Sequence, residues 1–425
     1  MSIQLKPARR VRGEITVPGA IETAERELLL ACLSAGQSRL SNSPLGLCSL
    51  FEELRPLGIK IGRPNGGLIV TGRKVGALDP GVGEIDLTAV SAALPIALAI
   101  LGGQGFVSRV RVGAHMPVAR EFLLRVEAMG ISWKSISDEL LELGGTKLHG
   151  CALVADDLEA EGKMGLMVAA LHASGTTCFE EVARKRDFAV RTLRSRGVDI
   201  ARQKTDGGSS SRVSICGGQK VQSGAVELAG DLQLTSPFLA LALSLSRSEL
   251  AVRNVEVCSG TRPFFDLMRQ LGGQVELVHD GDGRHRLEAR STNLKATRIA
   301  GKRVEKLLDQ LPLVAVVATQ ANGEFLIRDI AHLRCGPLDR VAHLVEQLRA
   351  MDAKIGEFPE GIVIKGGSLL RGARIDCAGD PAFAQAFAIA GLLAEEDTEL
   401  EAAESLEDVI PKFFETLESI TKEKK

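Results

Sequence analysis

An anion-binding geometry is predicted near the N-terminus, where Val17-Pro18-Gly19 ends an extended stretch and an apolar helix follows. The first turn of such a helix has free backbone N–H groups and the positive end of the helix dipole, which together favour an anion. Arg26 lies in the same segment and would add a cation, whereas Ile21 and Glu22 occupy the turn itself. The segment therefore has the scaffold of an anion site without the side chains that such a site normally uses.

Other reactive residue types have alternative interpretations. Cys335 in the loop LRCGPL could be a nucleophile, but no His or other base is fixed beside it, which favours an ordinary loop thiol. The stretch HDGDGRH at 279–285 contains the residue types of a metal site, yet Asp-Gly-Asp-Gly between strands is more typical of a hairpin turn. The segments GGQG and GGSLLRG lack the Lys of a phosphate loop and are interpreted as turns.

The charge balance argues against polyanionic partners. Among 425 residues, 52 Lys and Arg oppose 54 Asp and Glu, so no basic excess indicates a nucleic acid or a membrane surface. The chain has one Trp and no Tyr, which makes stacking platforms for bases or sugars improbable. We therefore expect neither a nucleic acid nor a membrane as a partner; the sequence names no protein partner.

The cysteines and the N-terminus favour a reducing compartment. The eight Cys are scattered without a CxxC pair or a His at zinc-ligand spacing, so neither a metal nor another cofactor is predicted. The N-terminus MSIQLKPARRVRG lacks the apolar core of a signal peptide, and no uncharged apolar run reaches about 18 residues. A cytoplasmic location is expected.

One pattern recurs along the chain about six times. An apolar helix leads through a small-residue turn to a strand, and a second, amphipathic helix follows and usually ends at Gly. Examples are ELLLACLSAGQSRLSNSP before LFEELRPLGIKI, and FLALALSLSRSELAVRNVEV before LMRQLGGQVELV. The first helix of each unit is apolar nearly all round and must be buried, so the units have to pack together.

This repeat predicts an α/β protein of two domains with three units each. The Gly- and Ser-rich segment 205–231 is the best candidate for a crossing between the halves. The N-terminal strand is expected to pack with the C-terminal half, which places a second crossing near residue 19. The predicted domains are residues 20–228 and residues 1–19 together with 229–425.

The repeat and several motifs resemble the EPSP synthase (3-phosphoshikimate 1-carboxyvinyltransferase) family of enolpyruvyl transferases over nearly the whole chain. The motifs that carry the resemblance are VPG-ER-LLLA at 17–31, RDF-VRTLRSRGVDI at 186–200, AGD at 229–231, RNVEVCSGTRPFFDLMRQLGG at 253–273, LLDQLPLVAVVA at 307–318, IRDIAHLRCGPLDRV at 327–341 and the final GDPAFAQAFAIAGLLAEE. His115 lies where the related UDP-GlcNAc enolpyruvyl transferases keep a catalytic Cys, which argues against that relative.

The resemblance implies a fold, a pathway and a reaction. Each half would be an inverse α/β barrel of three βαβαββ-like units, with substrates bound in the cleft between the halves. The family enzymes of the shikimate pathway, which supplies aromatic amino acids, transfer an enolpyruvyl group from phosphoenolpyruvate to shikimate 3-phosphate. Because both substrates are anionic, such a site needs cations to hold them and acid and base groups to move protons.

Four residues match functional positions of the family. Asp309 aligns with the catalytic base, although a carboxylate at a helix start is also favoured by the dipole alone. Arg26, Arg186 and Arg340 align with substrate-binding positions. Arg340 follows Asp339 at a helix start and could equally form a structural ion pair. For Arg26, and for Arg186 beside Asp187, a structural role is favoured.

Most of the other functional positions of the family are substituted. The Lys and Ser at the turn, the Asn and Arg of the phosphoenolpyruvate loop, the Ser-Ala-Gln of the third unit, the Lys-Glu pair, the His-Arg pair and a late Lys are absent. The residues found there are Ile21, Glu22, Ala89, Pro95, Glu159, Ala160, Glu161, Gly336, Pro337, Pro381, Ala382 and Asp408.

These substitutions remove about five cations and add carboxylates. At about 1.5–3 kcal/mol for each charge-assisted hydrogen bond, the loss amounts to roughly 7–15 kcal/mol, whereas micromolar binding is about 8 kcal/mol in total. We expect a family member that does not perform the standard reaction, a pseudoenzyme that could bind a partner or ligand without turnover. The alternative is an active 3-phosphoshikimate 1-carboxyvinyltransferase or related transferase with a remodelled site, which performs the same reaction or acts on a less anionic acceptor. By the resemblance, a ligand would be a small anionic or hydroxylated metabolite.

Overall fold

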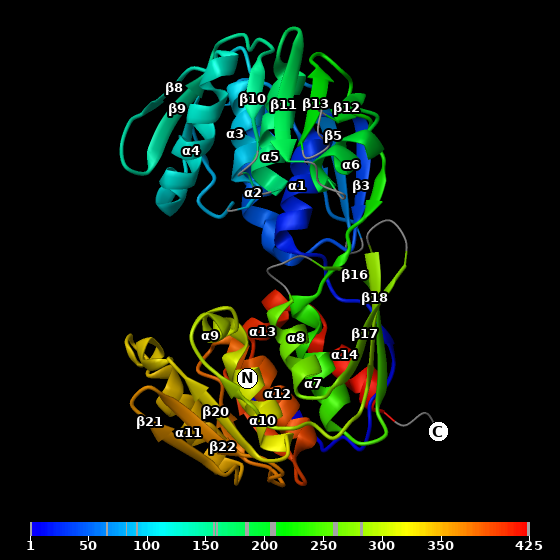
Figure 1. The fold of residues 1–425 in the computed structure, drawn as a ribbon, viewed down its shortest axis with the longest axis vertical. Helices are drawn as coiled ribbons and strands as arrows, with labels where there is room; N and C mark the ends of the chain where they lie inside the picture. The colour runs from blue at the N-terminus through cyan, green and yellow to red at the C-terminus, as the bar shows by residue number, and fades with distance from the viewer. Residues whose placement is uncertain are drawn as a thin grey trace. The chain divides into compact units, whose positions relative to one another are not determined.

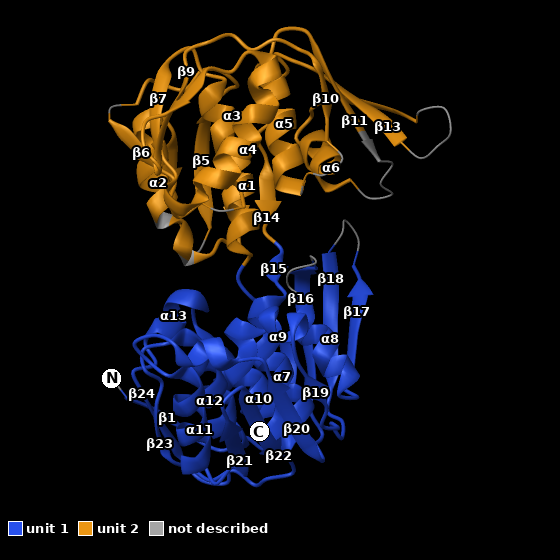
Figure 2. Cartoon of the chain, turned by 60° about the vertical axis from the view of Figure 1, so that its left-hand side comes forward, with its two compact units in different colours: residues 1–18, 229–425 blue, residues 19–228 orange. Residues whose placement is uncertain are grey.

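The computed structural model describes residues 2–64, 67–81, 83–90, 92–155, 158, 160–182, 187–204, 210–257, 262–280 and 284–422. The chain divides into two compact units (Figure 2). Unit 1 consists of Met1–Pro18 with Ala229–Lys425, and unit 2 consists of Gly19–Leu228. Each unit has its own hydrophobic core, so the elements of each are described separately.

Unit 2 consists of βαβαββ repeats (Figure 1). The first contains α1 (Ile21–Cys32), β3 (Ala35–Ser41), α2 (Cys48–Leu54), β4 (Lys60–Gly62) and β5 (Leu68–Arg73), and its leading strand is β14 (Ala225–Glu227) from the end of the unit. The second contains β6 (Glu84–Asp86), α3 (Leu94–Gly102), β7 (Val107–Arg111), α4 (Met116–Val126), β8 (Trp133–Ser135) and β9 (Leu140–Gly144). The third contains β10 (Ala152–Val154), α5 (Ala160–His172), β11 (Thr176–Val182), α6 (Phe188–Ser195), β12 (Ile200–Lys204) and β13 (Ser210–Cys216).

Unit 1 repeats the same order after two N-terminal strands, β1 (Ser2–Leu5) and β2 (Arg12–Ile15). The fourth repeat contains β15 (Gly230–Asp231), α7 (Ser236–Ser244), β16 (Glu249–Glu256), α8 (Pro263–Gln270), β17 (Gln274–His279) and β18 (Arg284–Arg290). The fifth contains β19 (Arg298–Ile299), α9 (Lys302–Glu305), α10 (Leu311–Gln320), β20 (Glu324–Arg328), α11 (Arg340–Ala350), β21 (Ile355–Phe358) and β22 (Gly361–Lys365). The last contains β23 (Arg374–Asp376), α12 (Pro381–Leu393), β24 (Thr398–Glu401), α13 (Ser405–Val409) and α14 (Phe413–Thr421).

The sheets show the repeat most clearly. Their orders are β14-β3-β5-β4, β6-β7-β9-β8 and β10-β11-β13-β12 in unit 2, and β15-β16-β18-β17 and β19-β20-β22-β21 in unit 1. In each, the first two strands are parallel and the remaining pairs are antiparallel. The sixth repeat closes with the N-terminus, because β1 pairs with β24, and β2 joins the sheet of the fourth repeat beside β16.

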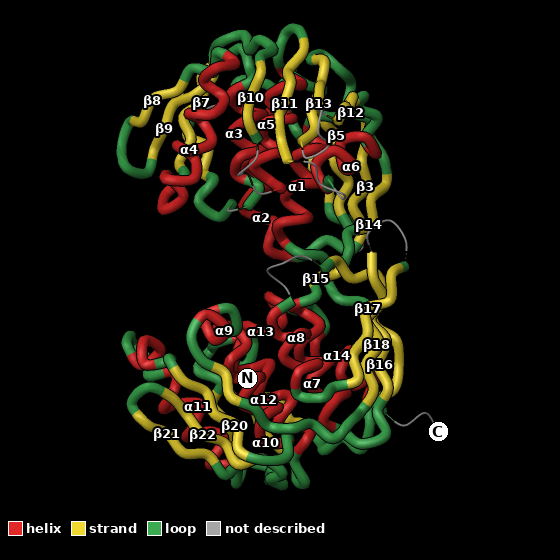
Figure 3. Tube along the Cα trace, viewed as in Figure 1, coloured by secondary structure: helices red, strands yellow, loops and turns green. Residues whose placement is uncertain are grey.

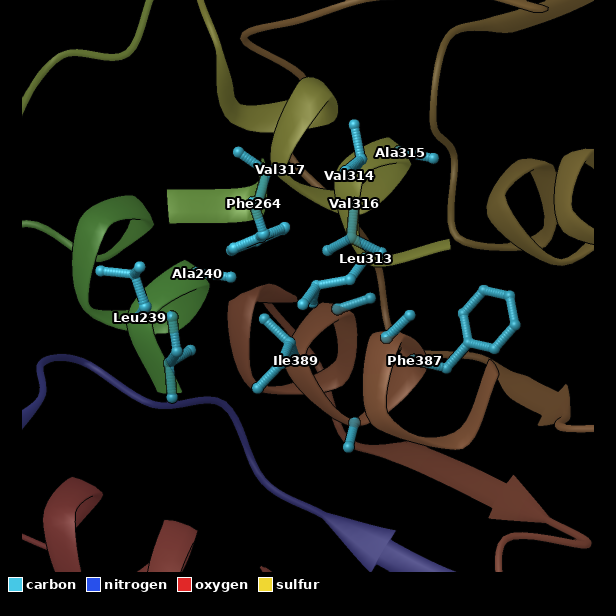
Figure 4. Close-up of a cluster of buried hydrophobic side chains, with 14 of the residues drawn as sticks. Leu239, Ala240, Phe264, Leu313, Val314, Ala315, Val316, Val317, Phe387 and Ile389 are labelled. Carbon is cyan, nitrogen blue, oxygen red and sulfur yellow. The ribbon is translucent and has the colours of Figure 1, made fainter. Parts of the chain in front are cut away.

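The apolar helix of each repeat lies inside its unit, with the strands outside (Figure 3). All of α3 is buried, as is α5 from Gly162 to Leu171, because these helices are apolar nearly all round. In unit 1 the side chains of α7, α10 and α12 pack on one another around residues such as Leu239, Leu313 and Ile389 (Figure 4). The architecture confirms the predicted α/β class with inverse barrels. Among the described residues, no helix is long and apolar enough to cross a lipid bilayer.

Two local predictions have different outcomes. The second helix was expected to end at a left-handed Gly, and Gly58, Gly130, Gly197 and Gly272 do have positive φ, whereas Asp352 takes this conformation in the fifth repeat. The predicted crossing segment 205–231 contains β13 and β14 of unit 2, and it includes the boundary between the units, which lies between Leu228 and Ala229. Its described Gly and Ser residues lie in short strands and turns; residues 205–209 lie outside the described residues.

Candidate functional site

The anion-binding position predicted near the N-terminus lies at the start of α1. Ala20 precedes the helix and provides no side-chain cap, and Glu22 is the acidic residue of the first turn. Ile21 is 46% exposed. This end of α1 therefore has an acidic side chain and no side-chain cap where the helix dipole would favour an anion.

Arg26 is one turn further along α1 and is buried, with 4% of its surface exposed. Its Nη1 donates a hydrogen bond to Oε1 of Glu161 at 3.2 Å, and its guanidinium lies 4.3 Å from the ring centre of Phe188. Its Nε has no hydrogen-bond acceptor among the described residues but lies 4.0 Å from Oε1 of Glu27. A cation that could have held a ligand is thus paired with a carboxylate of its own unit.

A second ion pair lies on the neighbouring elements of unit 2. Lys163 of α5 is 4% exposed and its Nζ contacts Oδ2 of Asp187, which caps α6 by accepting from the N–H of Val190 at 3.2 Å. Nη1 of Arg202 is 3.9 Å from the same carboxylate oxygen. Burial alone would raise the pKa of Asp187, but the hydrogen bond and charge of Lys163, the Val190 amide and Arg202 together lower it.

A third pair joins α1 to the end of α6. Glu27, 7% exposed, accepts a hydrogen bond from Nη2 of Arg196, which is 4% exposed. Glu25 on the same helix is also 4% exposed, and its Oε2 has no hydrogen-bond donor among the described residues. Burial, and to a lesser extent the charge of Glu22, raises the pKa of Glu25 from 4.5 to about 7.

The sequence reasoning named Arg26, Glu161 and Asp187 in this cluster but did not foresee how they pair. It did not name Lys163, Arg196, Glu25 or Glu27. A signal was present, because Lys163 interrupts the otherwise apolar run GLMVAALH and Glu25 and Glu27 precede LLLAC. A charge within an apolar helix is buried only when it is paired. Arg186 and Glu159, which the resemblance also placed at this site, lie outside the described residues.

Asp309 is exposed in a 3-10 turn, Leu308–Gln310, directly before α10. Among the described residues its carboxylate has no hydrogen bond or ion pair. It lines a cavity of about 40 Å³ together with Gln233 and Glu305, little more than the volume of one water molecule. The next residue, Gln310, donates to the hydroxyl of Ser236 at 2.9 Å. Asp309 is accessible to a ligand, but this cavity is too small to hold one.

Arg340 begins α11 and is held by an acidic side chain of unit 1. Its Nη1 is 2.5 Å from Oδ2 of Asp380, whose other oxygen caps α12 by accepting from the N–H of Ala382 at 2.8 Å. The guanidinium also lies 5.1 Å from the ring centre of Phe383. Arg340 therefore neutralises a helix-capping carboxylate.

The residue before Arg340 forms a second such arrangement. Asp339 caps α11 through the N–H groups of Val341 and Ala342, and Nη1 of Arg334 is 3.2 Å from its Oδ2. Arg334 also binds Glu357 at 3.0 Å. Burial would raise the pKa of Asp339, but these amides and Arg334 lower it overall. Arg334, Asp339 and Arg340 of the family-like segment thus have structural partners here.

The substituted positions lie at the starts of helices or in exposed loops. Pro95 is buried in the first turn of α3, and Pro381 and Ala382 form the first turn of α12. Gly336 and Pro337 are exposed in the loop before α11, and Asp408 is exposed in α13. None of these side chains can donate a proton at neutral pH or carries a positive charge.

The other candidates give no reactive cluster. Cys335 is a free, exposed thiol. His279 pairs with His285 across the antiparallel hairpin of β17 and β18, as the turn interpretation predicted, with residues 281–283 outside the described part. Within the described residues, no group of three or more His, Cys, Asp or Glu side chains is arranged to hold a metal ion.

Comparison with known proteins gives one consistent family. Residues 5–417 match the family described as EPSP synthase (3-phosphoshikimate 1-carboxyvinyltransferase). The chain is 29% identical over 430 residues to a 3-phosphoshikimate 1-carboxyvinyltransferase of Desulfitobacterium hafniense, covering 98% of this chain and 97% of that one. It is 28% identical over 432 residues to the Brevibacillus brevis protein of the same name, covering 99% and 100%.

Solved structures agree in fold. EPSP synthase from Acinetobacter baumannii superposes with a TM-score of 0.75 at 20% identity, covering 99% of this chain and 98% of that one. The enolpyruvyl transferase NikO from Streptomyces tendae superposes with a TM-score of 0.64 at 16% identity, covering 98% and 96%.

Proposed function

Because the chain belongs to the EPSP synthase family, we propose that it keeps the family fold but does not catalyse enolpyruvyl transfer to shikimate 3-phosphate. Its role would then be binding without turnover. The observation that carries the proposal is the pairing of Arg26 with Glu161, which places a carboxylate on a buried cation that the family uses for an anionic substrate.

The charge inventory of unit 2 supports the proposal. Lys163 is paired with Asp187, and Arg196 with Glu27, in addition to the Arg26 pair. A phosphate that bound Lys163 or Arg196 would have to displace a buried carboxylate and leave it without a partner, which costs several kcal/mol. These three cations are therefore poorly suited to a phosphorylated substrate.

Unit 1 supports the proposal because the residues at its substituted positions lack the groups that the family reaction needs. Protonation of the phosphoenolpyruvate methylene and departure of phosphate require an acid and cations. Gly336, Pro337 and Ala382 provide neither, and Arg340 is engaged by Asp380. Since each acid or base group contributes about 10²–10⁴-fold, the loss of several would bring turnover below detection.

A remodelled enzyme is the second candidate, and Asp309 favours it. This carboxylate is exposed and has no partner among the described residues, as a general base for a substrate hydroxyl would be before its substrate binds. An acceptor with less negative charge than shikimate 3-phosphate would make fewer demands on the missing cations.

The deciding experiment combines calorimetry with a phosphate-release assay. Purified protein is titrated with shikimate 3-phosphate and then incubated with this substrate and phosphoenolpyruvate, both at about millimolar concentration, where even weak family binding would register. The Desulfitobacterium hafniense relative is the positive control. We expect no heat and no released phosphate; micromolar binding together with phosphate release would contradict the proposal.

A further inference from the structure

The sheet of the sixth repeat ends one strand earlier than the sheets of the other repeats. In each of the other five, the third strand is antiparallel to the second, and a fourth strand is antiparallel to the third. The sixth sheet has the order β23-β24-β1, and its parallel and antiparallel pairs match the first three positions. No described strand pairs with the other edge of β1, which is therefore an open edge.

The backbone groups on this open edge can be identified. On β24, Glu399 and Glu401 use their backbone groups to bond to the chain at β23. The residues that alternate with them face β1 instead, and these lie opposite Ile3 and Leu5. The N–H and C=O of Gln4 therefore point away from β24, towards the position that a fourth strand would take.

A groove of about 780 Å³ lies along β1 and is bordered on its other side by α14. Its lining includes Ile3 and Leu5 of β1 and Phe414 and Leu417 of α14, all of which belong to the core of unit 1 or pack against it. In the fourth and fifth repeats the amphipathic helix packs on the fourth strand, α8 on β17 and α11 on β21. The groove thus combines the two surfaces that a fourth strand contacts elsewhere in the unit, an open strand edge and an apolar helix face.

The charges at the groove favour an acidic occupant. Lys6 and Arg9, which follow β1 and line the groove, are exposed and have no ion-pair partner among the described residues. Of the two carboxylates in the lining, Glu418 is paired with Lys422, and Glu415 is the other. A second copy of this chain pairing through its own β1 would add more cations and no carboxylate, because residues 1–10 contain no Asp or Glu.

We propose that the groove between β1 and α14 is a docking site for an extended, acidic segment of a partner protein, which adds antiparallel to β1 as a fourth strand. Apolar residues at alternate positions of the segment would face α14, and acidic residues on its other face would lie near Lys6. In this mode of recognition the main-chain hydrogen bonds, here to Gln4, provide affinity and the side chains provide specificity. The groove contains none of the residues aligned with the family site, so the inference goes beyond the proposed function and does not depend on it.

The test uses a peptide that the chain itself places in the fourth position of another sheet. Residues 273–280, GQVELVHD, contain β17, and Val275 and Leu277 alternate there with the acidic Glu276. A synthetic peptide of this sequence, labelled with fluorescein at its N-terminus, is titrated with the full-length protein at pH 8 and followed by fluorescence anisotropy. We expect saturable binding with a dissociation constant at or below about 1 mM. A peptide with Val275→Ser and Leu277→Ser should bind at least about tenfold more weakly, because it has lost its apolar face.

Two variants of the protein separate strand pairing from charge. Gln4→Pro removes an N–H that faces away from β24, so the fold should be retained, whereas peptide binding should weaken about tenfold through the lost hydrogen bond and the obstructing ring. Lys6→Glu should weaken binding about 3–10-fold, and less at high salt. Lys295→Glu reverses another exposed charge of unit 1 and should leave binding unchanged. Circular dichroism melts establish that each variant is folded.

The proposal is overturned if the folded wild type shows no saturable binding of the peptide, or if folded Gln4→Pro and Lys6→Glu proteins bind it as the wild type does. Sedimentation of the free protein tests the other occupant: a dimer that Gln4→Pro dissociates would show that a second copy fills the groove, which also overturns the proposal. None of these measurements involves shikimate 3-phosphate or phosphoenolpyruvate, so failure here is distinct from failure of the proposed function.

Discussion

Glu25 is a carboxyl group that the fold holds in an unfavourable environment. It is 4% exposed, lies one turn after Glu22, and its Oε2 has no donor among the described residues. Its pKa of about 7 lies above the ordinary 4.5, first because of burial and second because of Glu22. The folded protein therefore binds a proton here that the unfolded chain releases at lower pH.

This residue predicts a pH-dependent stability. The folded-state pKa is raised, so the contribution of Glu25 is fully present below about pH 4.5 and is lost as pH rises towards 7, by about 3 kcal/mol at most. Replacement by Gln keeps the neutral shape. We expect Glu25→Gln to lie within about 1 kcal/mol of the wild type near pH 5 and to exceed it by more in free energy of unfolding at pH 8.

Denaturant unfolding at pH 5, 6, 7 and 8 measures the difference between the two proteins. Glu22→Gln serves as the control, because removing the like charge should lower the pKa of Glu25 and reduce the loss at pH 8. A difference between wild type and Glu25→Gln that is the same at every pH would contradict the assignment.

At the scale of single residues, the sequence shows which side chains of the family site are missing, but it does not show which residues the remaining ones contact. That Ile21, Pro95, Gly336 and Ala382 cannot serve the family reaction follows from their side chains alone. The partner of Arg26 is 135 residues away, and only the packing of α1 against α5 brings the two together. The pairing of Arg340 with Asp380 was likewise left open, because an Arg at a helix start can bind either a ligand or a carboxylate.

At the scale of the elements, the same close contact recurs in two repeats: the glycine that follows the last strand of the hairpin lies against the backbone at the end of the buried helix. A Cβ on Gly217, directly after β13, would lie 1.8 Å from the carbonyl oxygen of Ala173 at the end of the α5 region. On Gly366, directly after β22, it would lie 1.6 Å from the carbonyl oxygen of Ala321, which follows α10. In both repeats the sheet packs against the end of the buried helix at a distance that only Gly allows.

Gly217→Ala should therefore destabilise unit 2 by about 3 kcal/mol, because the obstructing atom belongs to the backbone and cannot rotate away. Gly224→Ala in the same unit is the matched control, since a Cβ there meets nothing within 4 Å. Thermal melts of both variants measure the effect. Equal melting temperatures would show that the backbone adjusts without loss.

The repeated pattern made the long buried helices predictable, but it could not predict very short strands. Helices such as α3 and α10 have no polar face, so their burial could be inferred without knowing their partners. The short strands β14 and β15 could not be inferred, because two or three residues carry no alternating pattern. The Gly- and Ser-rich composition of 205–231 likewise did not show that β13 and β14 lie within it.

On the scale of the whole molecule, unit 2 is a continuous insertion into unit 1. Its two ends meet at Asn42, whose carbonyl oxygen accepts from the N–H of Gly19 at 3.1 Å and whose Nδ2 donates to the oxygen of Leu228 at 3.0 Å. In unit 1 the N–H of Asp231 donates to the oxygen of Pro18 at 2.9 Å. The two ends of unit 2 thus lie close together, and so do Pro18 and Asp231, which flank the point where unit 2 interrupts the chain of unit 1.

Residues 19–228 expressed alone should fold, because the segment contains a complete core and its ends are already joined by hydrogen bonds. We expect one cooperative thermal transition and the ion pairs of α1, α5 and α6 to persist. Residues 229–425 alone should be unstable, since they lack β1 and β2. Circular dichroism and hydrogen exchange of the two fragments test this; a disordered 19–228 fragment would contradict it.

The pairing of the first strand with the last has a consequence for the order of events on the ribosome. Leu5 pairs with Thr398, and Ile15 with Val252, so the N-terminal strands emerge long before their partners exist. At about 5–20 residues per second, the first strand waits roughly 20–80 s for its partner, while unit 2 can complete its core. During that interval β1 is an unpaired edge, exposed to other chains, and a chaperone that holds extended segments would be expected to bind the nascent protein there.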